Sequence, residues 1–160
     1  MKTDLKESSF LAGRLLIAAN LTVSTAESCT GGLLSHVLTI VSGSSSYFIG
    51  GIVAYSNRIK EHILGVKPET LNTFGAVSQE TAKEMAEGVR RKFETDIGLS
   101  TTGIAGPTGG TPEKPVGLVW VGLSTAEGTA AFECHFNADR EGVKQLTVEK
   151  LLQLLIEEIE

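Results

Sequence analysis

The chain has 160 residues, of which 41% are hydrophobic and 21% are charged. This length and composition fit one folded domain over residues 1–160 and exclude a mainly disordered protein. The 19 acidic and 14 basic side chains give a formal net charge of −5. Because non-specific binding to nucleic acid needs a basic face that displaces counterions, we expect no nucleic-acid partner.

The apolar runs and the cysteines narrow the protein class further. No apolar stretch approaches the roughly 18 residues of a membrane span, so we expect no membrane association. Arg14 interrupts the apolar run near the start, which does not fit a secretory signal peptide. Cys29 and Cys134 are too few for a disulfide framework, and with the histidines they match no known metal-ligand spacing. We therefore expect a cytoplasmic protein with reduced thiols and no bound metal.

Helical and strand patterns alternate along the chain, which is typical of a layered α/β domain. A helix over residues 5–19 comes first and should pack on the rest of the domain. The next predicted elements are a strand over 21–26, a helix from Ser28 to about Val41, a strand over 49–55, a short helix from Asn57 to Leu64 and a longer helix from Ser78 to Phe93. Asn57 and Ser78 are the predicted N-caps of the last two helices.

The second half of the chain is richer in strands. The predicted elements are a strand over 96–102, an irregular loop over 103–115, strands over 116–124 and 129–136, and a last helix from about Asp139 to Ile159. Alternation in the 129–136 strand predicts one shared face for Ala130, Phe132, Cys134 and Phe136. Because the later strands include a hairpin, we expect a mixed sheet.

The first candidate site is the segment 26–32 (AESCTGG), where a predicted strand passes into a helix. The unpaired N–H groups and positive dipole end of a helix stabilise an oxyanion beside a nucleophile. Ser28 is the candidate nucleophile, with backbone donors around Cys29 to Gly31. Alternatively, Ser28 or Thr30 only caps the helix and the glycines only permit close packing. Cys29 is a rival nucleophile, but the sequence around it favours a cysteine that only packs in the interior as a small side chain.

The second candidate site is the segment 55–60 (YSNRIK). A serine nucleophile needs a base at neutral pH, and the three histidines are scattered among helix and strand patterns. Lys60 together with Tyr55 is the remaining option for the base. Lysine acts as a base only if burial or nearby positive charge lowers its pKa. The alternative is that Lys60 is an ordinary solvated lysine.

The third candidate site is a loop rich in glycine and proline, TTGIAGPTGG at residues 101–110. Consecutive backbone N–H groups in such a loop form a nest for an anion. The alternative is a crossover without a function. The prolines and the apolar strand that follows favour an ordered loop, so we expect this segment to bind an anionic ligand.

Several motifs occur together in one order: AESCTGG, the glycine pair before VAYSN-R-I-K, GAVSQET, TGIAGPTGG and EKPVGLVW. They resemble the CinA C-terminal domain family from about residue 5 to the end. The family has a three-layer α/β/α sandwich with a mixed β-sheet. It includes the stand-alone nicotinamide mononucleotide amidases, which hydrolyse the carboxamide of nicotinamide mononucleotide to nicotinate mononucleotide and ammonia. The resemblance therefore implies this α/β fold and this activity.

The resemblance also implies roles for particular residues. Ser28 corresponds to the nucleophile of the family, and Tyr55 and Lys60 correspond to its tyrosine and lysine, so these three are the expected catalytic residues. The expected substrate-binding residues are Cys29, Thr30, Gly31, Thr102, Gly103, Gly106, Gly109 and Arg140. Arg140, Lys114 or Arg58 could neutralise the phosphate of the substrate, and the sequence leaves that choice open.

The expected ligand is a pyridine nucleotide, turned over without a cofactor or metal ion. The resemblance further implies self-association into a homo-oligomer. Two other functions remain open, namely an amidase for another small amide and a non-catalytic module that senses a nucleotide or binds a partner. A module that only binds has no need for a serine, a lysine and a tyrosine in these motifs, so their presence favours an enzyme.

Overall fold

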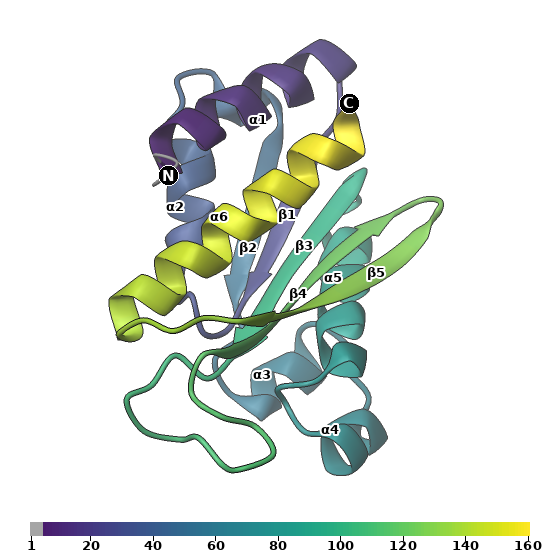
Figure 1. Ribbon diagram of the computed structural model, residues 1–160. Coiled ribbons are helices and arrows are strands. Elements are labelled where there is room, and N and C mark those ends of the chain that lie inside the picture. The colour runs from purple at the N-terminus through teal and green to yellow at the C-terminus, as the bar shows by residue number, and fades with distance from the viewer. Residues whose placement is uncertain (1–4) are drawn as a thin grey trace.

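A computed structural model describes residues 5–160 of the protein (Figure 1). In this range the strands are β1 (Val23–Glu27), β2 (Phe48–Val53), β3 (Ile97–Gly103), β4 (Leu118–Thr125) and β5 (Gly128–His135). The helices are α1 (Leu5–Ala19), α2 (Leu33–Thr39), α3 (Asn57–His62), α4 (Pro68–Phe74), α5 (Gln79–Phe93) and α6 (Arg140–Ile159), with a short 3₁₀ turn at Ser44–Ser46.

The strands form one mixed sheet in the order β2-β1-β3-β4-β5. β1 runs parallel to both β2 and β3, whereas β4 is antiparallel to β3 and pairs with β5 in a hairpin. The mixed sheet expected from the sequence is confirmed.

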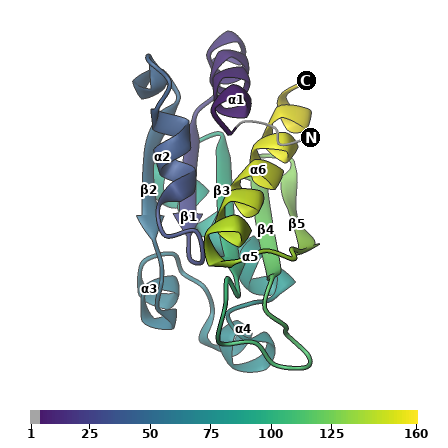
Figure 2. The ribbon, with the colours of Figure 1, turned by 60° about the vertical axis from the view of Figure 1, so that its left-hand side comes forward.

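Helices cover both faces of the sheet (Figures 1 and 2). α5 packs on one face, while α2 and α6 lie on the other and α1 packs against both of them. Each face has its own apolar core, with Leu34, Leu99 and Leu151 in the larger cluster and Met85 and Val89 in the smaller one. This arrangement is the three-layer α/β/α sandwich that the family resemblance implied.

The amphipathic pattern of α5 is borne out by its burial. Ser78 caps the helix by accepting a hydrogen bond from the Thr81 N–H at 3.2 Å. Ala82, Met85 and Val89 are fully buried along the predicted stripe. Among the described residues, no helix is long and apolar enough to cross a membrane.

The helix predicted from Ser28 begins five residues later, at Leu33. Gly31 and Gly32 have φ angles of 60° and 106°, a left-handed conformation that interrupts a helix. Residues 28–32 therefore form turns between β1 and α2. The prediction that Ser28 lies at a helix N-terminus is wrong.

Two short helices also differ from the prediction. α3 is capped by Ser56, whose hydroxyl accepts a hydrogen bond from the Ile59 N–H, and not by Asn57. α4 was not expected, because it has only seven residues and little apolar periodicity. Pro68 begins it and Gly75 ends it.

The shared apolar face predicted for the last strand is only partly correct. Cys134 is buried, but Ala130 and Phe132 are exposed. β5 is the edge strand of the sheet, and α6 packs over β4 rather than over β5. Alternation reports which residues share a face but not whether a helix covers that face.

The parallel strands β1, β2 and β3 end at the same edge of the sheet. α3, α4 and the loop after β3 gather at this edge (Figure 1). In open α/β sheets, ligands bind outside the carboxyl ends of the parallel strands. The fold therefore places the three motif segments where a ligand site is expected.

Candidate active site

A cavity of about 280 Å³ opens at this edge of the sheet. Its lining residues come from the turn after β1, from α3 and the residues just before it, from the segment before α5, from the end of β3 and the loop that follows, and from the first residue of α6. They are Ser28, Cys29, Tyr55, Asn57, Lys60, Ala76, Val77, Thr102, Gly103, Ile104, Ala105, Gly106, Thr108, Gly109 and Arg140. All three expected catalytic residues line this one cavity.

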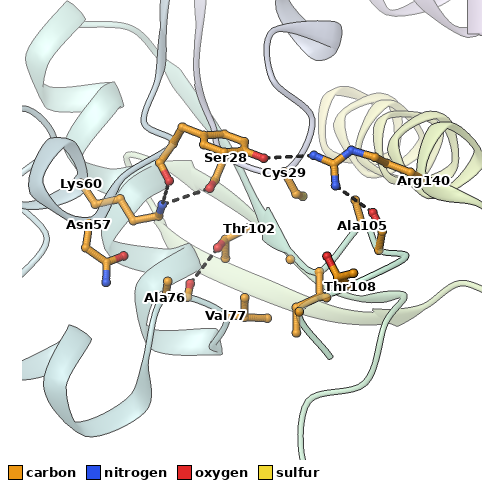
Figure 3. A pocket seen from close by; sticks show the side chains of 15 residues that line it. Ser28, Cys29, Asn57, Lys60, Ala76, Val77, Thr102, Ala105, Thr108 and Arg140 are labelled. Atoms are coloured by element: carbon orange, nitrogen blue, oxygen red, sulfur yellow. Dashed lines mark hydrogen bonds between the residues drawn. The ribbon is translucent and has the colours of Figure 1, made fainter. Parts of the chain in front are cut away.

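Ser28 and Lys60 form the central contact of the cavity. Lys60 projects from α3, its side chain is 1% exposed, and its Nζ donates a hydrogen bond to Ser28 Oγ at 3.0 Å. Figure 3 shows Lys60 reaching Ser28 from one side while Arg140 lies on the other. A lysine 32 positions away in sequence is thus the group that touches the serine hydroxyl.

Burial of Lys60 makes its amine easier to deprotonate than that of an exposed lysine. Burial lowers the pKa of Lys60 from 10.5 to about 8, although the neighbouring Cys29 thiol acts in the opposite direction. The amine also donates to the carbonyls of Ala54 at 2.7 Å and Tyr55 at 3.4 Å. When this amine loses a proton, it keeps two hydrogens for these carbonyls and gains a lone pair, so its hydrogen bond with Ser28 Oγ can reverse. Lys60 is therefore placed to accept a proton from Ser28.

The turn after β1 holds Ser28 by its backbone. The Ser28 N–H donates to the Thr101 carbonyl at 2.9 Å, and the Gly31 N–H donates to the Ser28 carbonyl at 3.1 Å. We expected an oxyanion to be bound by N–H groups around Cys29 to Gly31. Because the Gly31 N–H is bonded within the turn and Thr30 does not line the cavity, the donor that remains for this role is the N–H of Cys29.

Glu27, which no sequence pattern singled out, immediately precedes Ser28 and is fully buried. One carboxylate oxygen accepts hydrogen bonds from Thr30 Oγ1 and the Leu34 N–H, both at 2.7 Å. The other accepts from the N–H and the hydroxyl of Ser35. Glu27 thus fastens the turn to the first residues of α2. A charged residue at the end of a β-rich segment was the available signal.

Cys29 lies beside Ser28 but is poorly suited to nucleophilic attack. Burial raises the pKa of its thiol to about 12, so the thiol is protonated at neutral pH. Lys60 bonds to Ser28 and not to Cys29. The contact geometry favours Ser28 over Cys29 as the nucleophile.

Tyr55 and Arg140 form a second pair at the cavity. Arg140 donates to the Tyr55 hydroxyl at 3.0 Å and to the Gly106 carbonyl at 2.8 Å. The side chain of Tyr55 is largely exposed, and only its backbone carbonyl contacts Lys60. Of the three basic residues considered for the phosphate, Arg140 lines the cavity, whereas Lys114 bonds to the Phe74 carbonyl and neither it nor Arg58 lines the cavity.

Only some of the remaining expected site residues line the cavity. Thr102, Gly103, Gly106 and Gly109 line the cavity, whereas two others lie outside it. Thr30 is fully buried and bonds to Glu27 and Thr101, and Gly31 is exposed outside the cavity. Asn57, Ala76 and Val77 line the cavity and were missed, because no local pattern marks them.

Among residues 5–160, no three histidine, cysteine, aspartate or glutamate side chains gather in a way that could hold a metal ion. The polar groups of the cavity are hydroxyls, an amide, an amine and a guanidinium. This set suits hydrogen bonding and proton transfer.

Comparison with known sequences assigns the family. The model of the CinA C-terminal domain matches residues 6–159. A CinA-like protein of Kosmotoga olearia is 57% identical over 130 residues, which are 81% of this chain and 32% of that protein. A CinA-like protein of Endomicrobium trichonymphae is 51% identical over 145 residues, 91% of this chain and 34% of that protein. The chain spans about a third of the length of these curated relatives.

Solved structures agree with this assignment. The competence/damage inducible protein CihA from Agrobacterium tumefaciens is 40% identical and superposes with a TM-score of 0.94 over 98% of this chain and 96% of that one. A CinA superfamily protein from Klebsiella pneumoniae is 31% identical, with a TM-score of 0.95 over 98% of both chains. The family match, the sequence identities and the shared fold together show that the chain belongs to the CinA C-terminal domain family.

Proposed function

We propose that the protein is an amidohydrolase that converts nicotinamide mononucleotide and water to nicotinate mononucleotide and ammonia. The observation that carries the proposal is the 3.0 Å contact between Ser28 Oγ and the buried amine of Lys60. A serine joined to a lysine of lowered pKa is the arrangement that acyl transfer requires in the absence of histidine. The amide-bearing nucleotide is the substrate that the family resemblance implies.

The first half of the reaction forms an acyl-enzyme. Neutral Lys60 takes the Ser28 proton while Ser28 Oγ attacks the carboxamide carbon. The N–H group of Cys29 stabilises the negative oxygen of the tetrahedral intermediate. Lys60 then gives its proton to the departing nitrogen, the C–N bond breaks, and ammonia leaves.

The second half restores the enzyme. Water attacks the ester carbon and gives a proton to Lys60, the C–O bond to Ser28 breaks, and Lys60 returns the proton to Ser28 Oγ. Arg140 binds the phosphate of the nucleotide, and Tyr55 holds the guanidinium in place through its hydroxyl. In this scheme Tyr55 acts through Arg140 and Lys60 is the proton carrier.

The substrate is tested by ammonia release from a panel of three amides. Purified protein is incubated with nicotinamide mononucleotide, nicotinamide riboside and nicotinamide, without added metal and again with a chelator. We expect ammonia from the mononucleotide, much less from the compounds without phosphate, and no effect of the chelator. Absence of ammonia at high protein concentration would favour a module that only binds, and a preference for another amide would change the substrate.

A further inference from the structure

The hydroxyl of Thr102 lies in the wall of the cavity with its only hydrogen already committed. Thr102 is 1% exposed and lines the cavity. Its Oγ1 donates a hydrogen bond to the Ala76 carbonyl at 2.7 Å, as Figure 3 shows. A threonine hydroxyl has one hydrogen to donate and two lone pairs to accept. What remains for a ligand is therefore the acceptor side of this oxygen.

The partner carbonyl belongs to a segment that is itself fixed. The Gly75 carbonyl accepts hydrogen bonds from Ser78 Oγ at 2.9 Å and Thr81 Oγ1 at 2.7 Å. These bonds tie the residue before Ala76 to the start of α5, so Ala76 cannot easily follow a rotating hydroxyl. Turning the Thr102 hydrogen into the cavity would take the donor away from the half-buried Ala76 carbonyl, which costs free energy.

No group within residues 5–160 donates a hydrogen bond to Thr102 Oγ1. The charged groups of the same cavity, Lys60 and Arg140, are donors. Among the described residues, the cavity thus offers a buried acceptor that receives no hydrogen bond from the protein, in the same lining as Ser28. Such a group is complementary to a ligand N–H or O–H and unfavourable toward a second lone pair.

We infer that Thr102 determines specificity by accepting a hydrogen bond from the NH₂ of the substrate carboxamide. This inference rests on the proposed function and adds a rule to it. The amide nitrogen, which carries hydrogens, is favoured at Thr102, whereas a product carboxylate oxygen placed there meets a lone pair. The same contact therefore selects amide over acid and weakens the binding of the product.

Binding titrations with an inactive enzyme test the inference. Ser28→Ala is the background, so that nicotinamide mononucleotide is bound but not consumed, and nicotinate mononucleotide is the matched acid. Kd is measured for both ligands by calorimetry, first for Ser28→Ala and then for Ser28→Ala combined with a substitution of Thr102. Thr102→Val keeps a similar shape without the oxygen, and Thr102→Ser keeps the hydroxyl. Thr81→Val is the control, because Thr81 bonds to the same segment and does not line the cavity.

The decisive quantity is the ratio of the two Kd values, because effects common to both ligands cancel in it. We expect Thr102→Val to lower the ratio of the Kd for the acid to the Kd for the amide about tenfold, because the amide loses about one hydrogen bond. Thr102→Ser and Thr81→Val should leave it nearly unchanged. An unchanged ratio in Thr102→Val, or an equal shift in Thr81→Val, overturns the inference while the amidase proposal stands. If neither ligand binds and the wild type releases no ammonia, the proposed function fails and the inference with it.

Discussion

The pH dependence of catalysis follows from the buried amine of Lys60. Only the neutral amine accepts the Ser28 proton, and burial lowers the pKa of Lys60 to about 8. At pH 7 about one molecule in ten then carries the neutral amine, and at pH 9 about nine in ten do. We therefore expect kcat/KM to rise about tenfold between pH 7 and pH 9 and to level off above pH 9. A lysine with its ordinary pKa of 10.5 would instead give a kcat/KM that still rises steeply above pH 9.

The assay is ammonia release at low substrate concentration, with ionic strength held constant across the pH range. Lys60→Arg should lose activity about as fully as Lys60→Met, on the order of 10³-fold, because arginine keeps its proton. Lys67→Met is the matched control, since Lys67 is exposed and does not line the cavity. A profile without a rise between pH 7 and pH 9, or a Lys60→Arg variant with most of the wild-type rate, would refute Lys60 as the base.

Three further predictions concern residues that line or support the cavity. Glu27→Gln places an amide against two hydrogen-bond donors, so we expect a loss of roughly 2 kcal/mol in the free energy of unfolding, measured by urea denaturation; a loss below about 0.5 kcal/mol would contradict the anchoring role. Tyr55→Phe removes one hydrogen bond of Arg140 and should raise KM several-fold with little change in kcat; a collapse of kcat would instead make Tyr55 a proton carrier. Iodoacetamide at pH 7.5 should leave activity intact, because burial raises the pKa of Cys29 to about 12; inactivation with label on Cys29 would argue for the thiol.

Local patterns predicted much of the fold because the decisive signals lie within single elements. The apolar stripe of α5 and its cap Ser78 are read from consecutive residues, and both are confirmed. The predicted start of α2 at Ser28 was wrong because Gly31 and Gly32 adopt left-handed φ angles. A glycine permits such angles but does not require them, so its presence alone could not settle where the helix begins.

In the candidate site, too, the sequence predicted residues that their chemistry identifies and missed contacts that only the fold creates. Ser28 and Lys60 were identified because serine chemistry without a suitable histidine needs another base, and the structure brings the two into contact. The contact of Thr102 with Ala76 joins residues 26 positions apart and has no local signature. Glu27 was missed for a related reason, since its four hydrogen bonds depend on the turn that follows it.

The most direct test of the central claim compares two neighbouring substitutions, Ser28→Ala and Cys29→Ala, at saturating nicotinamide mononucleotide. Ammonia release is followed for both variants and the wild type, with folding checked by circular dichroism. Because Ser28 bonds to Lys60 and the Cys29 thiol stays protonated, Ser28→Ala should lose on the order of 10³-fold or more in kcat while Cys29→Ala keeps much of it. An active Ser28→Ala beside an inactive, folded Cys29→Ala would contradict the account.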